Sequence, residues 1–262
     1  RGDNVFQWKV AHNHCISIDT VTITNNTPTI ISAGEDQVIC GTQTVLDATK
    51  TKLGIGEWSV IKGSAKFEDN RDHNTRVYNL GYGENILRWS VIENGTTHDD
   101  VSIVNNMPST PVAGADQAFC QDYTLLSANQ PAIGKGTWEV IGGAADFKDS
   151  SMAQTEVYNL GFGTNTLRWT IKHKGCVKSD DIVLTNNLPT PANAGEDKTI
   201  CADHAVLNGN NPEIGEGIWT IASGASSATF KEATHGNTEV TDLGKGANTL
   251  RWTITHENCI SY

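Results

Sequence analysis

Apolar and polar side chains alternate along a segment that occurs three times in the chain. Its first copy, residues 85–92, carries Leu87, Trp89 and Val91 at one set of alternate positions and Arg88 in the other set. Because successive side chains of a strand point to opposite faces of a sheet, this period of two predicts a strand with one buried face. The three copies share a Leu-Arg-Trp triplet that ends at Trp89, Trp169 and Trp252.

A second recurring segment, Gly-x-Gly-x-Trp, precedes each triplet and also predicts a strand. In its first copy Trp58 and Val60 share a face, and Trp89 follows 31 residues after Trp58. Two Trp-bearing strands of one repeat most simply pack in one hydrophobic core, and we expect the paired glycines to form turns with positive φ. The tryptophans expected in the cores are Trp58, Trp89, Trp138, Trp169, Trp219 and Trp252.

The spacing of three cysteines sets the period of the repeat. Cys40, Cys120 and Cys201 are 80 and 81 residues apart, and self-similarity at a fixed period indicates tandem domains. We expect repeats at residues 28–107, 108–188 and 189–262, the last lacking its final strand. Residues 1–27 are expected to be the C-terminal strands of a preceding repeat, so that the chain would be cut from something longer.

Turn residues divide the first full repeat into short segments of β-forming residues. The expected strands are 36–39, 42–48, 57–61, 65–68, 75–80, 85–92 and 101–104. Seven short strands with this turn spacing predict an all-β fold of tandem immunoglobulin-like β-sandwich repeats, each of about 80 residues.

Charge and hydropathy exclude several classes of partner. The formal net charge is -11, whereas nucleic acids and anionic membrane surfaces attract clustered Lys and Arg. We therefore expect no nucleic-acid partner. No apolar run approaches the roughly 20 residues of a membrane span, so we expect no span in these residues, and we expect no signal peptide among them.

The repeated motifs resemble those of a known family. They read Ala-Gly-x-Asp-x-x-x-Cys, Leu-x-Ala, Gly-x-Gly-x-Trp-x-Val, Thr-x-Val-x-x-Leu, Leu-Arg-Trp-Thr-Ile and Cys-x-x-Ser-Asp-Asp. Over the whole chain they resemble the PKD-like or immunoglobulin-like tandem repeats of giant Bacteroidota surface proteins, most closely the SprB-like gliding-motility adhesins of flavobacteria. The resemblance implies a filament on the outer cell surface, exported by type IX secretion, that partners the outer-membrane gliding and secretion machinery and attaches to surface polysaccharide.

The six cysteines occupy two recurring positions, which favours disulfides in an oxidising, extracellular setting over a metal site. The first position is a turn near the start of a repeat, and the second is a hairpin near its end, where the first full repeat has Thr96 instead. The turn cysteines are Cys40, Cys120 and Cys201, and the hairpin cysteines are Cys15, Cys176 and Cys259.

Three pairing schemes follow the repeat. Bonds within a repeat would be Cys120–Cys176 and Cys201–Cys259, with Cys40 left over. Bonds from a hairpin to the next repeat's turn would be Cys15–Cys40 and Cys176–Cys201, with Cys120 left over. Bonds from a turn to the next repeat's hairpin would be Cys40–Cys176 and Cys120–Cys259, and these leave no demonstrable orphan.

We favour the third scheme, with the bonds within a repeat as the alternative. In an immunoglobulin-like sandwich the turn and the hairpin lie at opposite ends, so end-to-end stacking would bring them together between neighbouring repeats. The same stacking would place the tips at Tyr82, Phe162 and Lys245 against the loops at Ile133 and Ile214, unless these tips are exposed to solvent.

Acidic residues also recur at the starts of two strands that run parallel in a sandwich. They are Asp36, Asp116 and Asp197 at the first strand and Asp99, Asp100, Asp180 and Asp181 at the last. Converging carboxylates could bind Ca²⁺, although Asp also caps turns by accepting backbone hydrogen bonds. We favour the turn role and expect no bound metal and no cofactor.

No arrangement of residues predicts catalysis. Almost every titratable group is a repeat position or a scattered surface residue, whereas an active site needs acid, base or nucleophile in a unique pocket. Arg88, Arg168 and Arg251 are expected to form cross-strand pairs on the outer face. We therefore expect a non-enzymatic stalk whose neighbouring repeats are its main partners. The alternatives are an array of carbohydrate-binding modules and accessory repeats of a secreted hydrolase.

Overall fold

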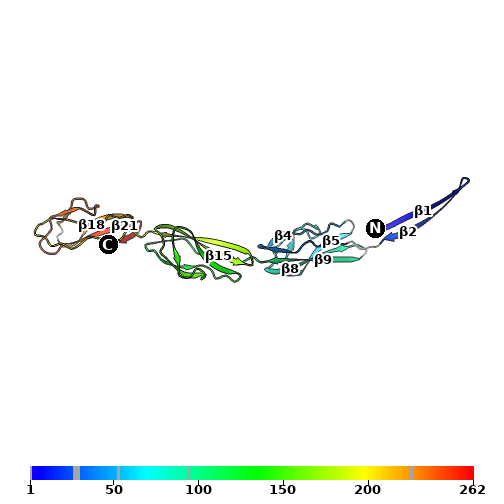
Figure 1. Cartoon of the computed structure of the whole chain (residues 1–262), viewed down its shortest axis with the longest axis horizontal. Coiled ribbons are helices and arrows are strands. Elements are labelled where there is room, and N and C mark those ends of the chain that lie inside the picture. Colours follow the sequence, from blue (N-terminus) through cyan, green and yellow to red (C-terminus); the bar gives the residue numbers. More distant parts are fainter. Residues whose placement is uncertain (1, 26–29, 52–53, 94, 225–226) are drawn as a thin grey trace. The chain divides into compact units, whose positions relative to one another are not determined.

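Strands and turns make up the chain throughout residues 2–25, 30–51, 54–93, 95–224 and 227–262, the part that the computed structural model describes. No helix occurs in these ranges. The chain divides into two units, residues 1–107 and 108–262, whose strands are traced in Figure 1. The expected boundary between residues 27 and 28 lies outside the described residues.

Unit 1 contains a hairpin and one sandwich. The hairpin pairs β1 (Gly2–His12) with β2 (Cys15–Asn25). One sheet of the sandwich has the order β3 (Gln37–Ile39), β9 (Thr96–Asn105), β8 (Gly83–Ile92) and β5 (Ile55–Lys62), and the other has the order β4 (Gln43–Val45), β7 (Arg76–Tyr78) and β6 (Lys66–Phe67). These strands overlap the seven predicted segments, and β5, β8 and β9 extend beyond theirs.

Unit 2 contains two sandwiches. The sheets of the second sandwich have the orders β10 (Gln117–Phe119), β16 (Cys176–Asn186), β15 (Gly163–His173), β12 (Lys135–Gly142), and β11 (Thr124–Ser127), β14 (Gln154–Tyr158), β13 (Asp146–Phe147). Those of the third have the orders β18 (Glu216–Ser223), β21 (Thr249–His256), β22 (Cys259–Ser261), and β17 (Ala205–Val206), β20 (Glu239–Thr241), β19 (Thr229–Phe230). The all-β class of tandem immunoglobulin-like sandwiches is thereby confirmed.

A pair of tryptophans forms the centre of each sandwich core. Trp138 of β12 lies directly opposite Trp169 of β15, and their ring centroids are 5.2 Å apart. Phe147 also stacks on Trp138, with the ring centroids 6.4 Å apart. The same centroid distance, 5.2 Å, separates the Trp pairs of the first and third sandwiches. All six rings are at most 3 % exposed, whereas Trp8 of the β1–β2 hairpin is 73 % exposed.

The two glycines before each of these tryptophans have different roles. Gly134 has a φ of +99° and forms the expected turn. Gly136 has no positive φ; instead, a Cβ there would lie 2.0 Å from Cζ2 of Trp169. The expectation of positive φ at both glycines is therefore wrong for the second, which is required by the tryptophan ring that lies against it.

A buried asparagine fixes the turn that leads into β15. Asn165 is fully buried, and its carboxamide nitrogen donates to the carbonyls of Gly161 at 2.8 Å and Gly163 at 3.1 Å. Its Oδ1 accepts the backbone N–H of Ala144 at 2.9 Å. One side chain thus satisfies backbone groups of two loops, as buried polar groups require.

Adding a methyl group at Gly136 tests this packing. We expect Gly136→Ala to destabilise the second sandwich by about 1–3 kcal/mol, because a Cβ forces the Trp169 ring out of its place. The measurement is urea unfolding followed by Trp fluorescence. Gly142→Ala is the matched control, since its Cβ would lie 3.6 Å from Thr166. Equal stability of the two variants would contradict the proposed role of Gly136.

Candidate functional site

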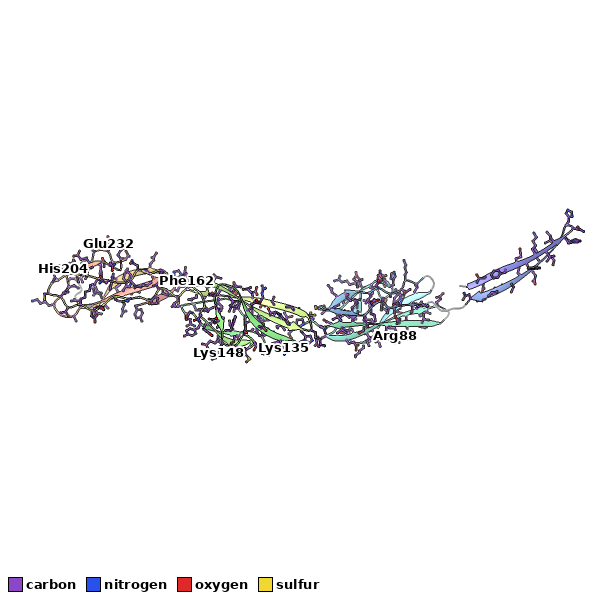
Figure 2. The ribbon with its side chains drawn as sticks, in the orientation of Figure 1. Arg88, Lys135, Lys148, Phe162, His204 and Glu232 are labelled. Atoms are coloured by element: carbon purple, nitrogen blue, oxygen red, sulfur yellow. A yellow bond between two sulfur atoms is a disulfide. The ribbon has the colours of Figure 1, made fainter. Side chains whose placement is uncertain are left out.

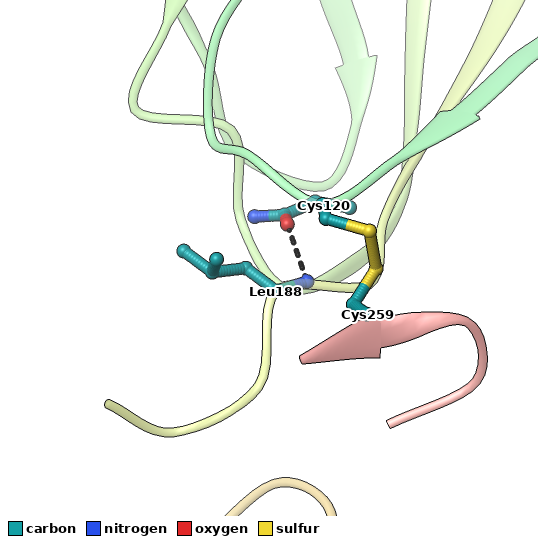
Figure 3. Close-up of a disulfide and its surroundings, with 4 residues drawn as sticks. Cys120, Leu188 and Cys259 are labelled. Carbon is teal, nitrogen blue, oxygen red and sulfur yellow. Dashed lines mark hydrogen bonds between the residues drawn. A yellow bond between two sulfur atoms is a disulfide. The ribbon is translucent and has the colours of Figure 1, made fainter. Parts of the chain in front are cut away.

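The junction between the second and third sandwiches is held by a disulfide. Cys120, just after β10, bonds to Cys259, the first residue of β22, with a Cα–Cα distance of 5.3 Å (Figure 3). The bond spans 139 residues of sequence. It therefore joins the turn of one sandwich to the hairpin of the next, which is the pairing of the favoured scheme.

The alternative bonds within a repeat, Cys120–Cys176 and Cys201–Cys259, are incompatible with this structure. β10 pairs in parallel with β16 so that Phe119 lies beside Asn186, whereas Cys176 is at the far end of that 11-residue strand. This length corresponds to about 30 Å, and bridged Cα atoms must lie within about 7 Å. Cys201 is an exposed free thiol, as is Cys15, while Cys40 and Cys176 are both disulfide-bonded.

Hydrogen bonds from two asparagines hold the linker that follows β16. The N–H of Asn187 donates to the carbonyl of Phe119 at 2.9 Å, next to the disulfide. Asn186 is 4 % exposed, and its Nδ2 donates to the carbonyl of Leu160 at 2.9 Å. Its Oδ1 accepts the N–H of Leu188, also at 2.9 Å (Figure 3). The linker is thus fastened to the second sandwich before the chain enters the third.

The same arrangement ends the sandwich of unit 1. The N–H of Asn106 donates to the carbonyl of Ile39 at 2.9 Å, and that of Met107 donates to Oδ1 of Asn105 at 3.0 Å. The carboxamide of Asn105 donates to the carbonyl of Leu80 at 3.2 Å. The expectations from the sequence assign these asparagines no role. The recurrence of Asn-Asn-x-Pro at 105–108 and 186–189 was the signal for their structural role.

An aromatic contact lies at the same junction. The ring of Phe162, labelled in Figure 2, is 5.2 Å from that of His256 at an interplanar angle of 59°. His256 lies opposite Cys259 in the β21–β22 hairpin. The hairpin that contains His256 also carries Cys259 of the disulfide. The expected contact of Phe162 with the loop at Ile214 stays a prediction.

The acidic residues considered for Ca²⁺ fasten the first strand of a sandwich to its last. The acceptor and donor pairs are Asp36 with Ser102 N, Asp99 with Ala33 N, Asp116 with Val183 N, and Asp180 with Ala113 N, at 2.8–2.9 Å. Asp197 is exposed and has no such partner among the described residues. Within that part of the chain, no group of three or more His, Cys, Asp or Glu side chains could hold a metal ion.

The remaining two carboxylates form cross-strand ion pairs on the outer face. Asp100 and Asp181 each accept two hydrogen bonds from the arginine directly opposite, Arg88 and Arg168, at 2.7–2.9 Å. The hydrogen bond from Arg168 lowers the pKa of Asp181 from its ordinary value. Arg251 lies instead over the ring of Tyr262, 4.8 Å from its centroid.

No protein-family profile matches the chain, and no curated protein sequence matches it. Among solved structures, a titin I-band fragment, I67–I69, is 12% identical with a TM-score of 0.40, covering 88% of this chain and 93% of that one. The N-terminal eight Ig domains of Down Syndrome Cell Adhesion Molecule are 11% identical with a TM-score of 0.36, covering 99% and 45%. The endo-fucoidan hydrolase MfFcnA4 is 10% identical with a TM-score of 0.28, covering 71% and 34%. At such identities these likenesses concern the fold alone.

The described part of the chain contains no helix that is long and apolar enough to cross a membrane.

Replacing Asp181 by Asn tests the outer-face ion pair. The pKa of Asp181 is lowered in the folded state, so the pair stabilises the fold above the unfolded-state pKa of about 4. This stabilisation is lost as the pH falls through the folded-state pKa. We expect a small loss of stability for Asp181→Asn at pH 7, because the pair is partly exposed, and a smaller difference in acid.

The measurement is the urea midpoint of both proteins across this pH range. Asp122→Asn, which removes the same charge at an exposed turn, is the control. A stability difference that stays constant down to the lowest pH would contradict the assigned role.

Proposed function

We propose that the chain is a structural stalk segment of a large secreted cell-surface adhesin, in which disulfides join consecutive repeats. The observation that carries this proposal is the Cys120–Cys259 bond, which connects two sandwiches. A disulfide inside a small domain would chiefly stabilise that domain. A bond between domains instead restricts their bending and twisting, which is the property that a load-bearing stalk needs.

The junction contains three kinds of restraint that support the same role. They are the disulfide, the hydrogen bonds from the backbone N–H groups of residues 187 and 188, and the Phe162–His256 contact. Interfaces between domains of one chain are otherwise expected to permit relative motion. Each restraint removes part of that freedom without providing a reaction site.

The proposal includes a second disulfide between consecutive repeats, Cys40–Cys176. Cys40 follows β3 as Cys120 follows β10, and Cys176 begins β16 as Cys259 begins β22. Both cysteines are disulfide-bonded. The repeat therefore supports the same pairing from a turn to the next repeat's hairpin.

The cellular setting belongs to the proposal as well. Disulfides persist in oxidising compartments, which supports an extracellular location. Attachment to the outer membrane, type IX secretion, a contribution to gliding motility, and contact with surface polysaccharide through other regions are supported by the resemblance of the repeat motifs. Binding of this segment to a glycan array would favour the carbohydrate-binding alternative, since the stalk proposal expects none.

Peptide mapping of the unreduced protein tests the connectivity. After alkylation of free thiols and proteolysis, we expect linked peptides for Cys120–Cys259 and Cys40–Cys176, with Cys15 and Cys201 alkylated. A reduced sample is the control, in which both linked peptides must disappear. Recovery of a Cys120–Cys176 peptide would overturn the proposed disulfide between repeats.

The mechanical role is tested by removing the Cys120–Cys259 disulfide. We expect the double variant Cys120→Ser, Cys259→Ser to be cleaved several-fold faster by protease at residues 187–190, because the junction opens more often. Cleavage is followed by mass spectrometry under native conditions. The control is Cys15→Ser, Cys201→Ser, which removes the two free thiols. Equal cleavage rates in both variants would mean that the disulfide does not restrain the junction.

A further inference from the structure

The outer face of the three-stranded sheet carries an exposed apolar side chain in every sandwich. Val45 of β4, Leu125 of β11 and Val206 of β17 occupy the same strand position, and each is more than half exposed. On the neighbouring strand, Tyr78 of β7 and Tyr158 of β14 are also exposed. The inner face of the same sheet packs in the core, so these outer residues contribute nothing to it.

Charged side chains lie on the same outer face, and their signs are reversed between the first two sandwiches. The positions are equivalent because the N–H of residue 68 donates to the carbonyl of residue 76 at 2.9 Å, as that of residue 148 does to residue 156. All six side chains are exposed. They are Lys66, Glu68 and Arg76 in the first sandwich, and Asp146, Lys148 and Glu156 at the same positions of the second.

Contacts within each sandwich hold two of these charges in place. A guanidinium nitrogen of Arg76 donates to Oε1 of Gln43 at 2.6 Å. In the second sandwich, Nζ of Lys148 lies 3.5 Å from a carboxylate oxygen of Glu156. Exposed contacts of this kind add little to the stability of a fold, but they position the charges on the face before any partner binds.

The reversal makes the two faces complementary to each other and not to themselves. The first sandwich offers two cations and one anion, and the second offers two anions and one cation. Two faces of the same kind would bring like charges together, which costs free energy, whereas unlike faces would bring opposite charges together. The third sandwich has no such excess, with Thr229, Lys231 and Glu239 at these positions and Thr241 in place of the tyrosine.

We propose that the three-stranded sheet of the first sandwich binds the three-stranded sheet of the second sandwich of another copy of this chain. Val45 and Tyr78 would pack against Leu125 and Tyr158, and the reversed charges would form the polar rim that interfaces have around an apolar centre. Each copy carries both faces, so every copy presents the complement of each face. The inference goes beyond the stalk proposal, because it joins separate copies and requires no disulfide.

Exchanging the two sets of charges tests the proposal. One variant carries Lys66→Asp, Glu68→Lys and Arg76→Glu, and the other carries Asp146→Lys, Lys148→Glu and Glu156→Arg. Every residue introduced is the one found at the equivalent position of the other sandwich. Both variants should therefore fold, and an unchanged thermal midpoint checks this.

The measurement is the weight-average mass by sedimentation equilibrium as a function of concentration. All proteins carry Cys15→Ser and Cys201→Ser, so that the two free thiols cannot link copies. We expect the parent to associate and each exchanged variant alone to associate at least about tenfold more weakly, because its two faces then have the same sign. An equimolar mixture of the two variants should regain the parent's affinity, and so should a chain with both exchanges.

The apolar centre is tested separately. We expect Val45→Asn to weaken the association at least about tenfold, because the interface would then cover a carboxamide that has no partner. Val206→Asn is the matched control, since it makes the same change at the same strand position of the third sandwich. It should leave the association unchanged.

Carbodiimide crosslinking of a mixture of isotopically labelled and unlabelled protein identifies the contact. We expect crosslinks between labelled and unlabelled copies that join Lys66 to Asp146 or Glu156. Crosslinks of these residues within single copies alone would overturn the proposal, since the two faces would then meet in one chain.

A protein that stays monomeric up to about 1 mM would also overturn the proposal. So would a mixture of the exchanged variants that fails to regain the parent's affinity, or an equal effect of the two Asn variants, because either result would place the association on another surface. None of these results bears on the stalk proposal, which the mapping of the disulfides decides.

Discussion

The packing of one tryptophan against another across neighbouring strands is the interaction on which each sandwich depends. Trp138 and Trp169 face each other in direct register, and the ring of Trp169 lies against the backbone of Gly136. Because both rings are almost completely buried, β12 cannot slip by one residue along β15 without turning Trp138 to the solvent face. This register fixes where β15 ends and therefore where the hairpin that carries Cys176 is located.

The constraint extends from the core to the ends of the repeat. With the strands in register, the turn after β10 and the hairpin at the start of β16 lie at opposite ends of the second sandwich. A disulfide between them is geometrically impossible, and the turn cysteine bonds instead to the hairpin of the following sandwich. Core packing thus determines that the covalent bond restrains the junction and leaves the stability of each sandwich to its own core.

Polar side chains complete the structure where the backbone would otherwise be unsatisfied. Asn186 connects Leu160, in the turn after β14, to the linker, and Asp116 and Asp180 connect the first strand to the last. The sequence showed that these residues recur, but recurrence fits both a ligand site and a backbone cap. The donor opposite each carboxylate decides between them, and that donor is a backbone N–H brought close by strands far apart in sequence.

The sequence by itself determined the strands, their buried faces and the tandem all-β class, because alternation and turn residues are local properties that three copies repeat. It also identified the tryptophans of the cores and the two positions of the cysteines. Only the tertiary structure decided that Cys120 bonds to Cys259, that Gly136 makes room for a ring, and that Phe162 meets His256. Each of these depends on a distance between segments that the chain order does not fix. The Gly-x-Gly-x-Trp pattern predicts the strand, but only the packing of the folded sandwich shows what each residue of the pattern contacts.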